Sequence, residues 1–294
     1  MMIIDGKKIA GEIQQEIKAI VNGCLTRPPC LAVILVGDHP PSQIYVNRKT
    51  EACQAVGIRS IRYELPAYTS EEEVLQLVGN LNNDPKVDGI LVQMPLPPHI
   101  RPQHIIYQIN PNKDVDGFHP INVGKMLIGE TDGFLSCTPL GIKVLLERSA
   151  IEVAGKHAVV IGRSNIVGKP MAAILMQNTP GGNATVTIAN RYSKDIKSLC
   201  LFAEIIIVAI GQPRFITADM VKEGTVIVDV GINKIDAPAK KSGYQIVGDV
   251  DYDNVAPKCS YITPVPGGVG PMTIAMLLQN TLKSYQKALK EGLF

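Results

Sequence analysis

Residues 159–175 read VVIGRSNIVGKPMAAIL. The stretch opens as a run of Val and Ile, turns at Gly162 and continues with the small and apolar residues of a helix. Such a turn offers free N–H groups at the start of the helix, and these attract phosphate. The usual dinucleotide fingerprint has glycines in its first, third and sixth places. Here Gly162, Ser164 and Val167 hold those places, so a strand–turn–helix without a ligand competes with a nucleotide site.

The next apolar run decides which nucleotide is expected. Residues 185–190 read TVTIAN, and Arg191 follows. An NAD site usually carries Asp or Glu at this point to bind the ribose hydroxyls. An acid would repel a 2′-phosphate, whereas the planar fork of an arginine attracts one. Arg191, together with Arg163 in the turn, therefore favours NADP over NAD; two solvated surface arginines are the alternative.

Other short apolar runs surround this stretch and alternate with helical patterns. Continuous apolar strands joined by helical crossovers predict parallel sheets covered on both faces. We expect an α/β protein with an N-terminal three-layer catalytic domain, a Rossmann-like doubly wound NADP domain and a cleft between them. The domains are predicted at 1–137 and 138–270, with the C-terminal helix 271–294 completing the first. The predicted strands include LAVILVG (31–37), DGILVQMP (88–95), KHAVVIG (156–162), EIIIVAIG (204–211) and TVIVDVG (225–231).

Helices are predicted where apolar residues recur on one face. Ser70 and Glu73 have the spacing of a capping box, which marks one helix start. The predicted helices span 7–21, 42–56, 70–82, 139–149 and 272–290.

Composition excludes several classes of protein. The 294 residues are 46% hydrophobic and 19% charged, with a formal net charge of +2 and no basic block, so nucleic acid is not an expected partner. No apolar run is long enough to span a bilayer, and the start of the chain lacks a signal pattern. Six scattered cysteines form no C-x-x-C pair, which argues against a metal site and for a reducing compartment, the cytoplasm or an organelle matrix; we expect a cytoplasmic location.

Tyr45 and Lys49 lie four residues apart, on one face of the helix expected over 42–56. Such a pair alone is usually a surface feature. A Tyr-x-x-x-Lys pair with an NADP site also resembles short-chain dehydrogenases, but there the pair follows the fourth strand of the nucleotide fold. Here it precedes that fold, so this interpretation fails.

Seven ordered motifs instead resemble the bifunctional methylenetetrahydrofolate dehydrogenase/methenyltetrahydrofolate cyclohydrolases. The resemblance runs from about residue 3 to residue 289, and PVPGGVGPMT and VQMPLP are its highly specific parts. The motifs are YVNRK (45–49), DGILVQMPLP (88–97), KDVDGFHPINVGK (113–125), CTP (137–139), GRSNIVGKP (162–170), DVGIN (229–233) and TPVPGGVGPMT (263–273).

This resemblance implies a role for each matched residue. Lys49 looks like the catalytic lysine, with Gln93 tuning it, Tyr45 packing on the folate and Asp116 binding the pterin. The implied substrate contacts also include Pro266, Gly267 and Gly268. The implied NADP contacts are Gly162, Arg163, Ser164, Arg191, Ile232 and Thr138. Tetrahydrofolate derivatives are the implied substrates, no metal is implied, and homodimers are the family's usual form.

The chemistry is consistent with these assignments. Hydride transfer from a methylene carbon between two nitrogens needs positioning against nicotinamide more than it needs a base. Hydrolysis of the resulting cation needs proton transfer, which a lysine can supply. Three alternatives stay open at this point: a member with one activity, a non-catalytic NADP sensor, and an unrelated NADP oxidoreductase.

Overall fold

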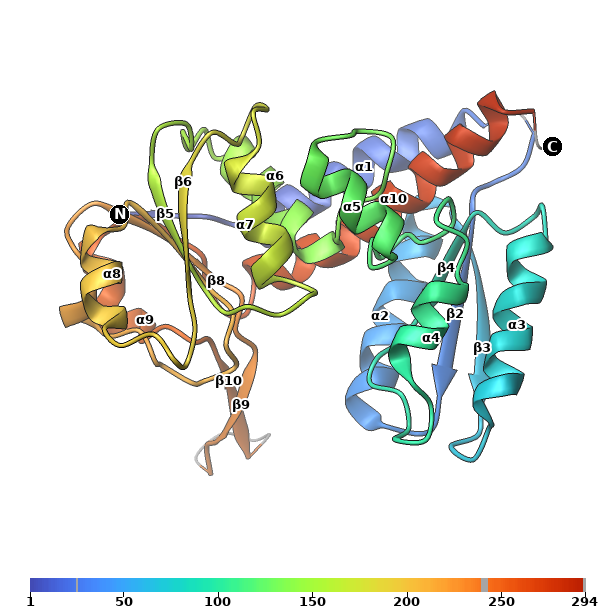
Figure 1. The fold of residues 1–294 in the computed structure, drawn as a ribbon, viewed down its shortest axis with the longest axis horizontal. Helices are drawn as coiled ribbons and strands as arrows, with labels where there is room; N and C mark the ends of the chain where they lie inside the picture. Colours follow the sequence, from blue (N-terminus) through green and yellow to red (C-terminus); the bar gives the residue numbers. More distant parts are fainter. Residues whose placement is uncertain (25, 239–242, 293–294) are drawn as a thin grey trace. The chain divides into compact units, whose positions relative to one another are not determined.

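The computed structural model describes residues 1–24, 26–238 and 243–292. The chain divides into two compact units (Figure 1). The 11–137 unit comprises Gly11–Cys137 and Ile274–Phe294, and the 138–273 unit comprises Met1–Ala10 and Thr138–Thr273. Both are α/β with parallel sheets, as predicted.

The 11–137 unit is built on a three-stranded parallel sheet in the order β3-β2-β4. The strands are β2 (Cys30–Val36), β3 (Arg59–Leu65) and β4 (Gly89–Val92). The central strand β2 is buried along its whole length, which explains its unbroken apolar sequence. Strand β3 was not predicted, because its sequence RSIRYEL carries charged residues on a partly exposed edge strand.

Helices cover both faces of this sheet (Figure 1). On α3, Val74, Val78 and Leu81 are spaced to form one apolar face, and they pack against alternate residues of β2. The predicted capping box is confirmed: Ser70 Oγ accepts from the Glu73 N–H, and the Glu73 carboxylate accepts from the Ser70 N–H. The helices with residues in this unit are α1 (Gly6–Asn22), α2 (Pro40–Val56), α3 (Glu71–Asn83), α4 (Pro102–Gln108), α5 (Pro120–Ile128) and α10 (Val269–Lys290). The predicted C-terminal segment 271–294 ends in two residues outside the described part.

The 138–273 unit contains a six-stranded parallel sheet in the order β1-β11-β8-β7-β5-β6. The chain order reverses between β5 and β7, which is the position where such sheets bind ligands. The strands are β1 (Met2–Ile3), β5 (His157–Ile161), β6 (Thr185–Ala189), β7 (Ile205–Val208), β8 (Thr225–Asp229) and β11 (Cys259–Ile262). Strand β1 was placed in the other domain by the predicted limits 1–137, but Met2 and Ile3 pair in parallel with Tyr261 and Ile262.

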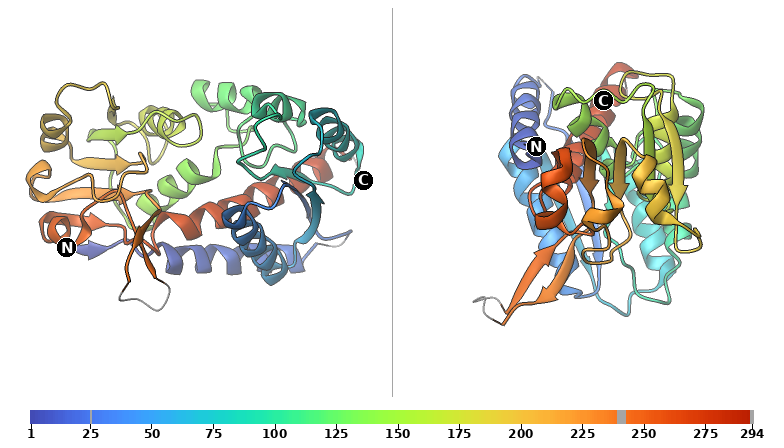
Figure 2. Two further views of the ribbon diagram at one scale, coloured as in Figure 1. Left: turned by 90° about the horizontal axis from the view of Figure 1, so that it is seen from below. Right: turned by 90° about the vertical axis from the view of Figure 1, so that its left-hand side faces the viewer.

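Helices also lie on both faces of this larger sheet (Figure 1). Val159 and Ile161 of β5 join a core with residues of α8 and α9, while Ala158 and Val160 alternate to the opposite face. The helices are α6 (Cys137–Arg148), α7 (Gly168–Met176), α8 (Ile196–Phe202) and α9 (Tyr252–Val255), with 3₁₀ turns at Ala218–Met220 and Ala256–Lys258. An unpredicted antiparallel hairpin, β9 (Asn233–Asp236) with β10 (Tyr244–Val247), projects from the sheet (Figure 2).

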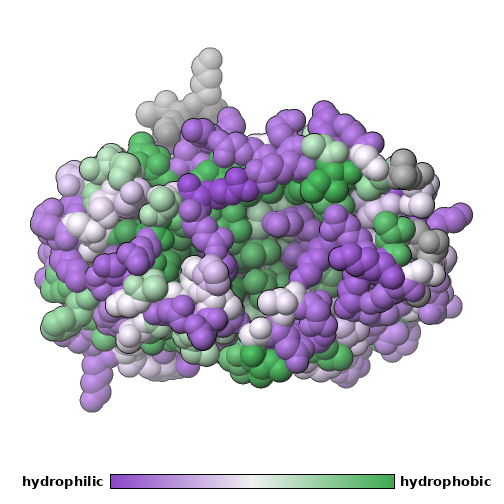
Figure 3. Space-filling model, turned by 90° about the horizontal axis from the view of Figure 1, so that it is seen from above, coloured by the Kyte–Doolittle hydropathy of each residue, from purple (hydrophilic) through white to green (hydrophobic). Residues whose placement is uncertain are grey.

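Hydrophilic and apolar side chains are interspersed over the face drawn in Figure 3. Among the described helices, none combines the length and apolar character needed to cross a bilayer. All six cysteines are described, and all are free thiols.

Candidate functional site

Lys49 and Gln93 meet at the carboxyl edge of the smaller sheet. Gln93 directly follows β4, and its N–H donates to the Ile34 carbonyl of β2 at 2.9 Å. Lys49 lies on α2, the helix that follows β2, and its Nζ donates to Gln93 Oε1 at 3.1 Å. Both side chains are half-buried, whereas Tyr45, one turn earlier on α2, is 37% exposed. The predicted proximity of Lys49 and Gln93 is therefore seen as a hydrogen bond that leaves the amine accessible.

Asp116 lies close to the same amine. Its segment runs beside β4, because Asp114 bridges Ile90 in parallel, so Asp116 is level with the end of that strand. Burial raises the pKa of the Asp116 carboxyl to about 6, and the positive charge of Lys49 partly opposes the rise. The positive charge of Lys49 thus acts on the Asp116 carboxyl at the same edge of the sheet.

Asp114 holds this segment in place, a role that the sequence did not suggest. Its buried carboxylate accepts from the Phe118 N–H at 3.2 Å, the His119 N–H at 2.8 Å and Asn122 Nδ2 at 2.8 Å. From α10, Asn280 Nδ2 donates to the carbonyls of Val115 and Leu135 at 2.8 and 3.0 Å. The backbone on both sides of Asp116 is therefore fixed by buried polar groups.

We expect Asp114→Ala to lower the free energy of unfolding by about 3 kcal/mol or more, since it leaves buried donors without acceptors that each cost ~1–3 kcal/mol. Denaturant unfolding would measure the loss. Asp132→Asn, at an exposed acid in the same unit, is the control and should change stability little. Equal stability of Asp114→Ala and the parent chain would show that the carboxylate does not hold this segment.

The turn after β5 has the tight backbone that its glycines predicted. Gly162 has φ +126°, and a Cβ there would lie 2.4 Å from the Ala209 carbonyl oxygen. A Cβ on Gly168, at the start of α7, would lie 2.3 Å from the Gly162 carbonyl oxygen. Ser164 Oγ accepts from the N–H groups of Val167 and Gly168 at 3.1 and 3.3 Å, so it caps part of the helix start that was expected to attract phosphate. The cradle that remains suits close approach of a dinucleotide to the backbone.

Arg163 and Arg191 follow β5 and β6, two neighbouring strands, and both are exposed. Each guanidinium also packs on the ring of Tyr192, which the sequence analysis had not selected. In the sequence, its position directly after the selected Arg191 could have drawn attention to Tyr192. The structure therefore brings the two predicted arginines together through a third residue.

The other predicted cofactor residues lie in the same unit. Ile232 is 52% exposed between β8 and β9, with its Cδ1 3.8 Å from the Cβ position of Gly270. Thr138 Oγ1 is 3.0 Å from Thr273 Oγ1. Ile232 and Gly270 thus lie side by side in this unit.

The loop that holds Pro266, Gly267 and Gly268 packs against the start of α1. The Lys7 N–H donates to the Gly267 carbonyl at 2.9 Å, and a Cβ on Gly6 would lie 1.9 Å from the Gly268 carbonyl oxygen. Close packing within the chain thus accounts for the small residues here. The three predicted substrate contacts belong to the 138–273 unit, whereas Lys49 belongs to the 11–137 unit.

Two buried carboxylates organise the loops at the carboxyl edge of the larger sheet. Asp229 accepts from the N–H groups of Gly231, Asp249 and Val250, and burial raises its pKa to about 6. Asp249 in turn accepts from the N–H groups of Ile210 and Gly211. The loops after β7 and β8, including the one with Ile232, are held by this pair.

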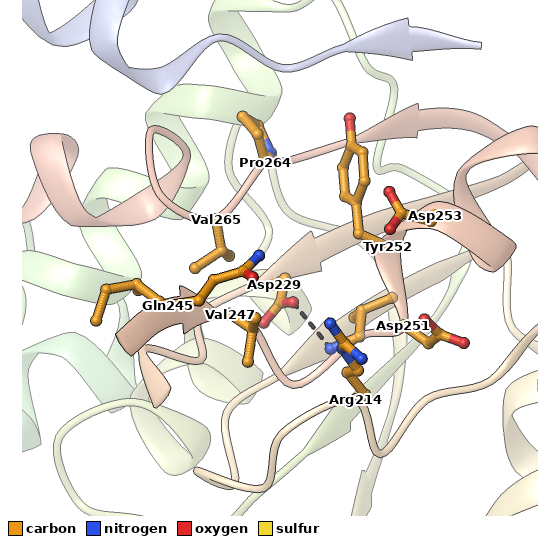
Figure 4. Close-up of a pocket in the computed structure, with 12 residues that line it drawn as sticks. Arg214, Asp229, Gln245, Val247, Asp251, Tyr252, Asp253, Pro264 and Val265 are labelled. Carbon is orange, nitrogen blue, oxygen red and sulfur yellow. Dashed lines mark hydrogen bonds between the residues drawn. The ribbon is translucent and has the colours of Figure 1, made fainter. Parts of the chain in front are cut away.

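A cavity of about 190 Å³ lies beside Asp229 (Figure 4), lined also by Arg214, Gln245, Tyr252 and Val265. A second cavity, of about 310 Å³, lies in the other unit between Asn82, Lys113 and Lys287. Neither contains a residue that the sequence predicted for the site. We place the chemistry on Lys49, Gln93 and Asp116, because the Asp229 carboxylate beside the first cavity already accepts from three backbone N–H groups, whereas the Lys49 amine stays accessible.

Comparison with known families identifies both units. The profile of the tetrahydrofolate dehydrogenase/cyclohydrolase catalytic domain matches residues 4–116, and that of the family's NAD(P)-binding domain matches residues 136–289. The bifunctional protein FolD of Protochlamydia amoebophila is 72% identical over 287 residues, covering 98% of each chain. That of Chlorobium phaeobacteroides is 53% identical over 291 residues, again covering 98% of each.

Solved structures agree with this comparison. The bifunctional enzyme FolD of Campylobacter jejuni has a TM-score of 0.92 at 50% identity, covering 98% of this chain and 99% of that one. The dehydrogenase–cyclohydrolase of Trypanosoma brucei, solved with NADP cofactor and an inhibitor, has a TM-score of 0.92 at 37% identity, covering 99% of each chain.

Proposed function

Because the chain belongs to the tetrahydrofolate dehydrogenase/cyclohydrolase family, we propose that it oxidises 5,10-methylenetetrahydrofolate with NADP and hydrolyses the 5,10-methenyl product to 10-formyltetrahydrofolate at one shared site. The observation that carries the proposal is the hydrogen bond between Lys49 Nζ and Gln93 Oε1, with the Asp116 carboxylate nearby.

In the first reaction the protein mainly positions the folate against the nicotinamide. NADP, when bound, accepts the hydride that leaves the methylene carbon. The chain contributes the cradle at Gly162 and Gly168, where any Cβ would meet the backbone. Arg163 and Arg191 supply positive charge beside this cradle for the 2′-phosphate.

The second reaction is proton chemistry. Water adds to the methenyl cation, one carbon–nitrogen bond breaks, and the released ring nitrogen takes up a proton. Lys49 can deliver and collect that proton, and Gln93 orients the amine without adding charge. Asp116, when ionised, accepts hydrogen bonds from the donor edge of the pterin, while the exposed ring of Tyr45 packs on the folate.

A homodimer forms part of the proposal. Among the residues that the structure describes, strand β3 pairs with β2 on one side and with no strand on the other, so that edge is open to a second copy of the chain. Light scattering should give twice the chain mass.

A cytoplasmic location stays a prediction.

Replacing Arg163 and Arg191 together by Ala should weaken NADP binding about 100-fold and leave NAD binding nearly unchanged, since each charge-assisted hydrogen bond is worth ~1.5–3 kcal/mol. Calorimetric titration with both cofactors measures the two dissociation constants. Equal losses for NADP and NAD would show that these arginines do not recognise the 2′-phosphate.

A further inference from the structure

Tyr192 makes an unusual set of contacts for an exposed residue. The residue is 68% exposed, yet the guanidinium carbons of Arg163 and Arg191 lie 5.3 and 4.9 Å from the centroid of its ring. Arg191 Nη2 also donates to the Tyr192 hydroxyl at 2.9 Å. The backbone beneath the ring is fixed, because the Tyr192 N–H donates to Asn190 Oδ1 at 3.0 Å and the Ser193 N–H donates to the Asn190 carbonyl at 2.8 Å.

This arrangement gathers positive charge without neutralising it. Within the described residues, neither Arg163 nor Arg191 lies within salt-bridge distance of a carboxylate. Two cations near one another repel, and the negative face of an aromatic ring offsets only part of that repulsion. An anion with several acceptor oxygens would satisfy both guanidinium forks together.

The position of the cluster selects the kind of anion. Arg163 follows β5 and Arg191 follows β6, next to the point where the strand order reverses. In a doubly wound sheet the adenosine ribose of a dinucleotide lies at the end of this second strand. The anion that reaches this point is the phosphate monoester on the 2′ carbon of the ribose.

We propose that Tyr192 is a positioning residue that sets the preference for NADP by holding Arg163 and Arg191 ready for the 2′-phosphate. The inference rests on the proposed function, since it presumes that these arginines face the cofactor. The ring restrains both guanidinium groups before binding, and the hydroxyl fixes the orientation of Arg191. Pre-ordering long side chains in this way lowers the entropy that binding would otherwise cost.

The test uses the intact chain and two probes that differ by the 2′-phosphate alone, 2′,5′-ADP and 5′-AMP. Tyr192→Ala should raise the dissociation constant of 2′,5′-ADP about five- to thirtyfold, because it removes two cation–π contacts and a hydrogen bond. The dissociation constant of 5′-AMP should not change. Tyr192→Phe keeps the ring and should give a smaller loss. In turnover, KM for NADP should rise while kcat at saturating NADP is kept.

Phe202→Ala is the matched control. Phe202 is 74% exposed at the end of α8, just before β7 begins, so it lies at the opposite, amino edge of the same sheet. The Phe202→Ala variant should bind both probes as the parent chain does. Thermal melting should show that every variant is folded.

Two outcomes would overturn the inference. Equal losses for both probes would mean that the ring contacts the adenine instead of acting through the arginines. Unchanged binding of 2′,5′-ADP would mean that the arginines need no support. The double variant of Arg163 and Arg191 separates the inference from its premise. If the double variant loses its preference for NADP but Tyr192→Ala keeps it, only the role of Tyr192 is wrong. If both variants keep the preference, the assignment of Arg163 and Arg191 to the 2′-phosphate is wrong as well.

Discussion

Lys49→Met lowers the rate of methenyltetrahydrofolate hydrolysis by about 10²–10⁴-fold, which is the usual contribution of general acid–base catalysis. Methionine keeps much of the apolar stem and removes the amine that donates to Gln93. Folate and NADP should still bind, and some dehydrogenase activity should remain because hydride transfer does not formally require the amine. The measurement is the decay of added methenyltetrahydrofolate above its spontaneous rate.

Arg48→Met is the matched control for this variant. Arg48 precedes Lys49 on α2, is exposed, and loses a positive charge by the same substitution. It should hydrolyse the substrate at the parent rate. If Lys49→Met is equally fast, Lys49 is not the catalytic lysine and the proposed proton route is wrong.

Asp116→Asn weakens folate binding about 5- to 150-fold, corresponding to the ~1–3 kcal/mol lost when a buried charged hydrogen bond loses one partner. NADP binding should persist. The parent chain should also bind folate less tightly as the pH falls below about 6, because the Asp116 carboxyl, whose pKa is raised to about 6, then takes up a proton and stops accepting. Fluorescence titrations over a pH series measure both effects.

The Asn variant should lack this pH dependence, since its amide does not titrate. Asp132→Asn, at an exposed carboxylate paired with Lys125, should keep both the affinity and the pH dependence of the parent. A folate dissociation constant unchanged by Asp116→Asn would refute the pterin-binding role.

The strands with continuous apolar sequence could be predicted because they are central and buried on both faces. Strand β3 escaped prediction because an edge strand tolerates charge at alternate positions, so its pattern resembles a loop. Strand β1 has only two residues, and its pairing with β11 joins the two ends of the sequence. Pairings between distant segments leave no local pattern from which to predict them.

Some residues of the candidate site could likewise be predicted from the sequence, and others could not. Lys49 and Gln93 lie 44 positions apart, and it was the resemblance of whole motifs that placed them together, since Tyr45 and Lys49 alone have an ordinary helical spacing. Asp114 lies in the same motif as Asp116, but its role depends on donors from α5 and its preceding loop. Tyr192 is the residue after Arg191, and only the folded turn shows that its ring contacts both arginines.

Turnover of 5,10-methylenetetrahydrofolate by the intact chain, with NADP and then with NAD, tests the central claim most directly. Absorbance would follow cofactor reduction, and chromatography would identify the folate product. We expect rapid reduction of NADP, much slower reduction of NAD, and 10-formyltetrahydrofolate formed faster than methenyltetrahydrofolate hydrolyses by itself. No reduction of NADP, or methenyltetrahydrofolate that accumulates and decays only at its spontaneous rate, would contradict it.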